Sequence, residues 1–385
     1  MEKIPVFSPY IDNETKSHLN NALDIGWLGM GAGTKEFEER IASFLNLKNR
    51  FVVATNTGTS ALHIGLKVAG VGPGDEVITP SFNYVADHQA IRMTGAEVVM
   101  CDISEENLGI DPKKIEKLIT PKTKAIIPLH FAGIPCNQKE IFQIAQKHGL
   151  RVIEDAMHAF GTKIDGRKIG NYGDITCFSF DPVKLITSID GGCVIVNTKE
   201  EEEKLHHLRF LGVDKDTIER YKNKRSWDYD VVSEGYRYHL TNIMASVGIS
   251  QIKKVDQFIS SRQNVCKQFN NAFKIISEIK IPNTNFNEIS PFIYSIRVLN
   301  NKREQLIQHL QDKKIEVGIH FIPVHKHSYF KNRKIGDMEI TNRVVSEILT
   351  ILLHSNIKNE LIERIINIYN KYNIINKIIR KFIYF

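Results

Sequence analysis

The sequence has few cysteines, and their spacing matches neither a metal site nor a disulfide framework. Only 5 cysteines occur in 385 residues, and no two of them form a Cys-x-x-Cys pair. Each lies in an apolar or mixed stretch: Cys101, Cys136, Cys177, Cys193 and Cys266. We therefore expect buried free thiols in a reducing compartment, and no zinc ribbon or stapled secreted fold.

Long hydrophobic runs and a targeting signal are also missing. No window approaches the roughly 18 uninterrupted apolar residues that a membrane span needs. Residues 1–16 lack the basic segment followed by an apolar segment that marks a secretory signal. We expect a cytoplasmic protein that does not act at a membrane.

Charge of one sign is not concentrated anywhere in the chain. The 51 Lys and Arg residues and 44 Asp and Glu residues give a formal net charge of +7, and basic and acidic side chains are interspersed. No basic stripe of the kind that binds nucleic acid is evident, so we expect no nucleic-acid partner. A mild positive field would suit a phosphorylated or acidic substrate, but a lysine-rich solvated surface explains it equally well.

Two further site types lack their signatures. Gly29–Gly33 is rich in glycine, but it lacks the Gly-x-Gly-x-x-Gly spacing and precedes any expected strand, which excludes a dinucleotide-binding fingerprint. His320, His325 and His327 are close in sequence, but no carboxylate lies among them. We expect no metal site there.

Strands and helices alternate over the first two thirds of the chain. Seven short, mostly apolar runs predict buried strands: Phe51–Ala54, Glu76–Thr79, Glu97–Cys101, Ala125–Pro128, Arg151–Ile153, Ile175–Phe178 and Cys193–Val196. Helical patterns fill several of the gaps: Ser60–Ala69, Tyr84–Met93, Pro112–Leu118 and Lys139–His148. Asp111 and Gly149 are expected as an N-cap and a C-terminal stop. This alternation predicts an α/β fold with a large, mainly parallel, seven-stranded sheet.

The pattern changes after about residue 240. Leu240–Phe269 predicts one or two long helices, and the chain then alternates shorter elements. Strands are expected at Phe292–Val298 and Ile315–His320, and helices at Arg303–Asp312, Thr341–Leu349 and Asn359–Ile368. The length suggests two domains. We divide the chain into a large α/β domain, 1–245, and a small C-terminal α+β domain, 246–385.

Two segments carry candidate chemistry. Asp155 directly follows an apolar strand, and Lys184 follows the next strand. Ligands gather at the carboxyl ends of strands in such sheets, so both side chains are expected in one crevice, although a structural ion pair is an alternative. Residues 57–60 open a helix after a strand and predict a phosphate cradle or, more simply, an N-cap. Together these are the parts of a pyridoxal phosphate (PLP) site.

The chain resembles the DegT/DnrJ/StrS aminotransferases, the sugar-aminotransferase branch of the fold-type-I PLP enzymes, almost from end to end. Each matching segment is weak alone, but all of them occur in order. They are Gly26–Leu28, Lys35–Glu38, Asn56–Leu62, Gly72–Val77, Glu154–His158, Ser179–Lys184, Gly235–His239 and His320–His325.

The resemblance implies roles for four residues around the cofactor ring. Lys184 matches the lysine that binds the cofactor covalently and then moves the proton. Asp155 matches the carboxylate that pairs with the pyridine nitrogen and keeps it protonated. Tyr84 matches an aromatic residue stacked on the ring. His158 matches a position near the phenolic oxygen, although taken alone it would be read as a core histidine.

The resemblance also implies the phosphate and substrate sites. Gly58, Thr59, Ser60 and Ser179 match residues at the cofactor phosphate. Arg237 stands where relatives often have an asparagine that reaches the partner subunit's cofactor phosphate, so the chain is expected to be a homodimer with its active sites at the interface.

Four residues are expected on the substrate side: Trp27, Leu28, His320 and His325. Two other departures from the family pattern, Asp181 in place of histidine and Asp190 in place of glutamate, are expected to tune the substrate pocket.

The implied function is transfer of an amino group from an amino acid, with L-glutamate the expected donor, to a nucleotide-linked keto-deoxysugar for surface-polysaccharide synthesis. PLP is the expected cofactor, with pyridoxamine 5′-phosphate (PMP) as its intermediate form. Lys184 favours transamination, since relatives with histidine there act as sugar dehydratases. The alternatives are a smaller phosphorylated ketone such as dihydroxyacetone phosphate, and a non-catalytic regulator that binds PLP or DNA.

Overall fold

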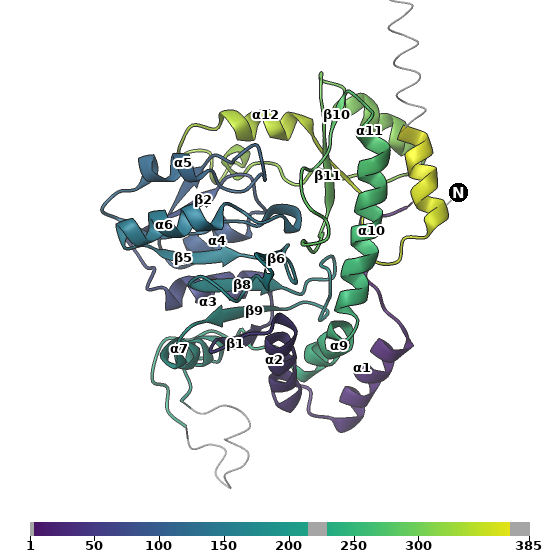
Figure 1. The fold of residues 1–385 in the computed structure, drawn as a ribbon. Coiled ribbons are helices and arrows are strands. Elements are labelled where there is room, and N and C mark those ends of the chain that lie inside the picture. Colours follow the sequence, from purple (N-terminus) through teal and green to yellow (C-terminus); the bar gives the residue numbers. More distant parts are fainter. Residues whose placement is uncertain (1–3, 215–228, 370–385) are drawn as a thin grey trace, which may run out of the picture.

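The computed structural model describes residues 4–214 and 229–369, and the tail Tyr372–Phe385 lies outside this part. A large sheet with helices on both faces fills one side of the molecule, and a smaller sheet built from the C-terminal third lies beside it (Figure 1). The predicted division between residues 245 and 246 falls inside helix α9 (Asn242–Ile252) and stays a prediction.

The large sheet has eight strands among the described residues, one more than the seven expected. In spatial order they are β1 (Phe51–Thr55), β9 (Gly192–Val196), β8 (Ile175–Ser179), β5 (Arg151–Asp155), β4 (Thr123–Ile126), β2 (Glu76–Pro80), β3 (Glu97–Cys101) and β12 (Lys334–Ile335). Strand β9 is antiparallel to both neighbours, and the other pairs are parallel. The predicted sheet is therefore confirmed. The extra strand, β12, is a two-residue edge strand from the C-terminal third. It is too short for a pattern of apolar residues in the sequence to predict it.

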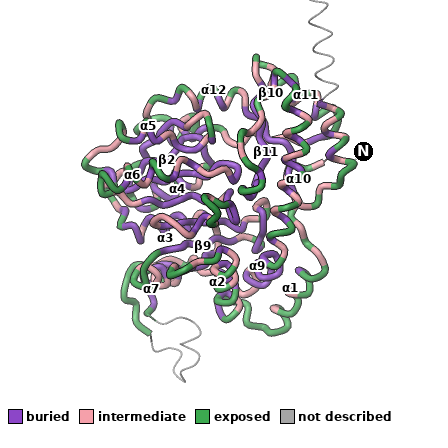
Figure 2. The backbone as a smooth tube through the Cα atoms, viewed as in Figure 1, coloured by how far each residue is buried: buried purple, intermediate pink, exposed green. Residues whose placement is uncertain are grey.

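Helices bury both faces of this sheet, which explains why its strands are almost wholly apolar (Figure 2). Successive strand residues point to opposite faces, so Val53 and Val52 enter different clusters. One face is covered by α3 (Gly58–Val68), α4 (Ala86–Met93) and α7 (Lys199–Arg209). The other is covered by α2 (Ala32–Leu45), α9, α5 (Pro112–Ile115) and α6 (Gln138–His148).

The four helices predicted in this region are present with small shifts at their ends. The segment 112–118 is helical throughout, as α5 continued by the 3₁₀ helix η1 (Glu116–Leu118). Its expected cap is confirmed, because the Asp111 side chain accepts from the backbone N–H of Lys113. Gly149 ends α6 in the left-handed conformation, with φ of 65°. Helices α1 (Asn13–Ile25), α2 and α7 were not predicted.

The smaller sheet is antiparallel, with the order β10 (Ile279–Lys280), β11 (Tyr294–Val298) and β13 (Ile348–Ile351). Its apolar side chains pack against α10 (Val255–Phe273), α11 (Arg303–Asp312) and the helical residues 359–369. The predicted helical stretch 240–269 is thus two helices, α9 and α10. Helix α12 (Glu339–Glu347) ends two residues before its predicted end, because Ile348 starts β13.

The predicted strand Ile315–His320 is wrong. Only two of its residues pair, and they pair with different partners: Ile315 with Ile4, and Gly318 with Thr350. Without a shared neighbouring strand, the segment makes isolated bridges and no ladder. The remaining described elements are short: η2 (Phe131–Gly133), the hairpin β6 (Lys163–Ile164) and β7 (Arg167–Lys168), and η3 (Val324–Lys326).

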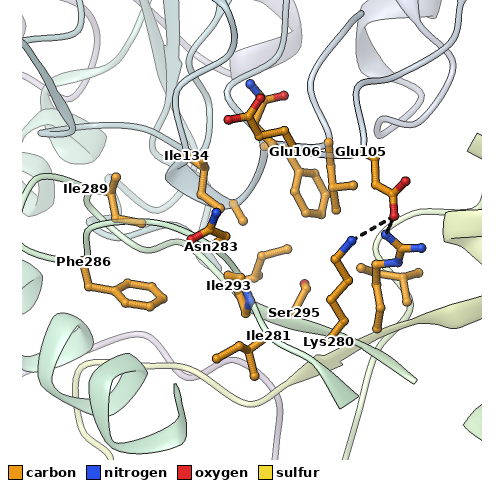
Figure 3. Close-up of a pocket in the computed structure, with 17 residues that line it drawn as sticks. Glu105, Glu106, Ile134, Lys280, Ile281, Asn283, Phe286, Ile289, Ile293 and Ser295 are labelled. Carbon is orange, nitrogen blue, oxygen red and sulfur yellow. Dashed lines mark hydrogen bonds and ion pairs between the residues drawn. The ribbon is translucent and has the colours of Figure 1, made fainter. Parts of the chain in front are cut away.

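A small cavity of about 160 Å³ lies between the two sheets. Figure 3 shows that Ile134, Phe286 and Ile293 gather around it, with Lys280 and Glu105 at one side. The ammonium of Lys280 donates to a carboxylate oxygen of Glu105 at 2.9 Å. Lys280 and Glu105 are therefore paired with each other.

All five cysteines lie in the described part, and all are buried and unpaired, as predicted. Among the described residues, no helix is long and apolar enough to cross a membrane.

We predict that Gly248→Ala destabilises the fold, although alanine normally favours a helix. A Cβ at Gly248 in α9 would lie 2.6 Å from the ring of Phe37, which is fully buried in α2. Overpacking of this kind costs about 1–3 kcal/mol, more than the helix propensity returns. Urea unfolding measures the difference. Gly72→Ala is the control, since nothing lies within 4 Å of its Cβ. A Gly248→Ala variant as stable as the control would contradict the α2–α9 packing.

Candidate active site

A cavity of about 560 Å³ opens at the carboxyl ends of the parallel strands. Eight of the predicted site residues line it: Gly58, Thr59, Tyr84, Asp155, His158, Ser179, Lys184 and His320. They come from the loops and strand ends that follow β1, β2, β5 and β8, and from the C-terminal third of the chain. The cavity thus lies where an α/β sheet positions ligands.

Asp155 ends β5 and is buried, with 4% of its surface exposed. Its Oδ1 accepts from the backbone N–H of Met157 at 3.0 Å, and its Oδ2 accepts from Nδ2 of Asn83 at 3.0 Å. The backbone N–H of Asp155 donates to the carbonyl of Pro128 at 2.9 Å. Both the strand and the carboxylate are therefore held in one orientation at the cavity wall.

Lys184 lies in the loop after β8 and is half-buried in the cavity wall. Its Nζ lies 4.3 Å from the centroid of the Phe292 ring. Burial lowers the pKa of Lys184 to about 8, although the carboxylates of Asp155 and Asp181 act in the opposite direction. An amine with this pKa is partly neutral near neutral pH, so it can act as a nucleophile and accept a proton.

The buried guanidinium of Arg262 in α10 holds the Lys184 loop from behind. Its Nη2 donates to the carbonyl of Lys184 at 3.3 Å, and its Nη1 donates to the carbonyl of Phe292 at 3.1 Å. Burial lowers the pKa of Arg262 to about 10, which still leaves it charged at neutral pH. One cation from the C-terminal third therefore links the lysine loop to the ring beside the lysine.

The loop before α3 forms an anion cradle. Thr57 caps the helix: its Oγ1 accepts from the N–H of Ser60 at 3.0 Å, and the Thr57 N–H donates to Oγ of Ser60 at 3.1 Å. A Cβ at Gly58 would lie 2.8 Å from the Cβ of Ser179. Only glycine therefore lets these two segments of the chain approach each other this closely. The start of α3 and the Ser179 side chain thus lie side by side, an arrangement that suits a phosphate.

One wall of the cavity is aromatic. The imidazole of His158 stacks on Phe292 with ring centroids 4.2 Å apart, and His320 lies edge-on to Phe7 at 5.5 Å. Burial lowers the pKa of His158 well below its usual range and that of His320 to about 4, and the Lys184 charge adds to both shifts. Both imidazoles are therefore neutral at neutral pH. Their Nδ1 atoms have no hydrogen-bond partner among the described residues.

Tyr84 stands at the mouth of the cavity, with 61% of its surface exposed and its ring 5.9 Å from that of Phe321. An open aromatic face at this position can lie against a flat ring.

The other predicted site residues do not line this cavity. Ser60 is buried in the cap network just described. The His325 Nδ1 is 2.7 Å from Oγ of Ser81, and Trp27 donates from Nε1 to the carbonyl of Met30 at 3.0 Å along a separate groove. Leu28 and Arg237 are exposed. Their predicted roles stay predictions.

Several lining residues were not predicted as site residues: Asn83, Asp87, Met157, Phe292 and Phe321. Asn83 and Asp87 had a signal, because they follow strand β2, whose carboxyl end lies at the same edge of the sheet as Asp155. Phe292 and Phe321 come from the C-terminal third. Phe321 lies in the matching segment His320–His325, whereas no local pattern relates Phe292 to the strand ends of the large sheet.

The described residues fit PLP. Asp155 has a buried carboxyl group that can face a pyridinium nitrogen, Lys184 is a poised amine, and the cradle at Gly58 suits a phosphate. The unpartnered Nδ1 of His158 offers a polar contact at the cavity wall. No group of three described His, Cys, Asp or Glu side chains is placed to hold a metal ion.

The chain is similar to a known enzyme family over almost its whole length. Residues 9–370 match the DegT/DnrJ/EryC1/StrS aminotransferase family. The chain is 35% identical over 345 residues to the spore coat polysaccharide biosynthesis protein SpsC of Bacillus subtilis, covering 86% of each. It is 34% identical over 365 residues to the uncharacterized protein MJ1066 of Methanocaldococcus jannaschii, covering 93% of this chain and 94% of that protein.

Among solved structures, the putative sugar aminotransferase Spr1654 from Streptococcus pneumoniae in its PMP form superimposes with a TM-score of 0.88. It is 29% identical, and the match covers 96% of this chain and 99% of that one. The PLP form of the same protein is also similar, with a TM-score of 0.86. The chain therefore belongs to the DegT/DnrJ/EryC1/StrS aminotransferase family and is a PLP-dependent aminotransferase.

Proposed function

We propose that this aminotransferase moves an amino group from L-glutamate to a nucleotide-linked keto-deoxysugar used in surface-polysaccharide synthesis. The placement of Lys184 and Asp155 in one cavity supports the chemistry. The similarity to SpsC, which is named for spore coat polysaccharide biosynthesis, supports the substrate class. The apolar wall formed by Phe7, Phe292 and Phe321 suits a sugar that has lost hydroxyl groups.

The residues divide the chemistry among them. When bound, PLP supplies a ring that withdraws electrons from the carbon bearing the amino group. Asp155 would place its carboxyl group at the ring nitrogen, and the cradle at Gly58 and Ser179 would hold the phosphate. Lys184 accepts a proton at Nζ and returns it to another atom of the bound reactants. The stacked His158 and Phe292 exclude water from that side.

We also propose that the enzyme is a homodimer in which the partner completes each site. Among the described residues that line the cavity, four carry carboxyl groups, and Lys184 is the only lysine or arginine. The four are Asp87, Asp155, Asp181 and Asp190. Such a site lacks the positive charge that a phosphate and a nucleotide diphosphate need. An exposed arginine outside the chain's own cavity, Arg237, is suited to supply it from a second copy.

A substrate panel tests the proposed function. With L-glutamate as donor and 2-oxoglutarate release as readout, we expect kcat/KM for a nucleotide-linked keto-deoxysugar to exceed that for dihydroxyacetone phosphate by roughly 100-fold, because remote contacts stabilise the transition state. The Lys184→Ala variant gives the background rate. Faster turnover of the triose phosphate would instead assign the smaller phosphorylated ketone as the substrate.

Mixed dimers test the shared site. We expect Lys184→Ala to be inactive and Arg237→Ala to bind PLP weakly. Random mixing of the two should restore about a quarter of the wild-type sites, because half of the dimers are mixed and each mixed dimer has one intact site. Lys147→Ala, at an exposed lysine on α6, is the control for lost surface charge. Mixtures no more active than either parent would contradict a composite site.

A further inference from the structure

Asp87, a residue of α4 with no assigned role, lies behind Asp155 at the cavity floor. Its side chain is buried, with 1% of its surface exposed, and Asp155 is 4% exposed. The two carboxyl groups are neighbours, because Nδ2 of Asn83 lies within 3.0 Å of an oxygen of each. Two buried carboxylates in contact would repel strongly, so the pair can hold only one negative charge at neutral pH.

Asn83 joins the two carboxyl groups. Its Nδ2 donates to Oδ2 of Asp87 at 2.7 Å and to Oδ2 of Asp155 at 3.0 Å. The orientation of the amide is determined, because its Oδ1 accepts from the backbone N–H of Tyr84 at 2.7 Å. Both N–H bonds of the amide are therefore used, one on each carboxyl group.

The charge is better placed on Asp155 than on Asp87. The N–H of Met157 and the amide of Asn83 both donate to Asp155, and donors stabilise the ionised form. Asp87 accepts from the same amide and, at a long 3.4 Å, from the hydroxyl of Thr79, while its Oδ1 has no partner among the described residues. An ionised Asp87 would leave a buried, unpartnered negative oxygen.

Among the described residues, no positively charged side chain is a main influence on the pKa of Asp87. On its own helix, burial keeps the neighbouring His88 neutral by lowering its pKa to about 3. From β8, the buried Cys177 stays a thiol, since burial and the neighbouring acidic groups raise its pKa. Lys184 interacts with Asp155 from the cavity side. Burial and the Asp155 charge accordingly raise the pKa of Asp87 well above its usual range.

We propose that Asp87 is a neutral carboxylic acid that donates its proton to Asp155, and that Asp87 and Asn83 are positioning residues that keep Asp155 ionised and aimed into the cavity. Asp155 then accepts three hydrogen bonds, from Met157, Asn83 and Asp87. The inference rests on the proposed role of Asp155 toward the cofactor ring. It concerns which of two acids carries the charge, so it is independent of the identity of the keto substrate.

Infrared spectroscopy of the cofactor-free protein tests the protonation directly. At pH 8 in D₂O, wild-type protein should show the carbonyl stretch of a protonated carboxyl group, and [4-¹³C]aspartate labelling should shift that band to lower frequency. The band should be absent from Asp87→Asn. A wild-type spectrum without the labelled band would overturn the proposal, whatever substrate the enzyme proves to use.

Two variants separate a hydrogen-bond donor from a mere space-filler. Asp87→Asn keeps the size, the neutrality and an N–H donor, so we expect its PLP dissociation constant and kcat to stay within about 3-fold of wild type. Asp87→Leu keeps the size without the donor and should weaken both by more than 10-fold, with the acid limb of the kcat profile moved to higher pH. Equal losses in the two variants, or an unchanged Asp87→Leu, would contradict the donor role. If Asp87→Leu fails to fold, the infrared result and Asp87→Asn decide.

Discussion

The proposed chemistry depends on one constraint, a carboxyl group buried inside the protein at the end of a central strand. Asp155 is almost fully buried, and an isolated charge there would cost several kcal/mol. The backbone around β5 positions it, and the N–H of Met157 and the amide of Asn83 stabilise it. The amine of Lys184, whose pKa burial lowers to about 8, lies in the same cavity. An anion and a poised amine across one cavity are what PLP chemistry requires.

The C-terminal third of the chain completes this site from the side. Phe292 supplies the ring beside Lys184, and Arg262 links the backbone carbonyls of both residues. Burial in the aromatic wall of the cavity keeps the imidazoles of His158 and His320 neutral. These two side chains therefore add no positive charge to the cavity. The positive charge that a phosphorylated substrate needs must then come from outside this set of lining residues. For this reason the proposed dimer and the proposed substrate class support each other.

Much of the large sheet is predictable from sequence, because strands buried on both faces are short apolar runs between helices with a 3.6-residue period. The ends of β5 and β8 likewise predict that Asp155 and Lys184 share a crevice. The two-residue strand β12 carries no periodicity, and the segment 315–320 is apolar enough for a strand but has no continuous partner. Phe292 and Arg262 could not be assigned, since their roles arise from contacts between elements distant in sequence. The place of Asp87 after β2 indicates only that it lies at this edge of the sheet. The charge of Asp87 in particular depends on its neighbours and not on its residue type.

We propose that the amine of Lys184 binds the cofactor opposite Asp155. Borohydride reduction of the PLP-loaded enzyme makes that linkage permanent, and peptide mapping by mass spectrometry locates it. We expect one modified lysine per chain, Lys184, and no modification in Lys184→Ala. A pyridoxyl group on any other lysine, or on none, would contradict the account.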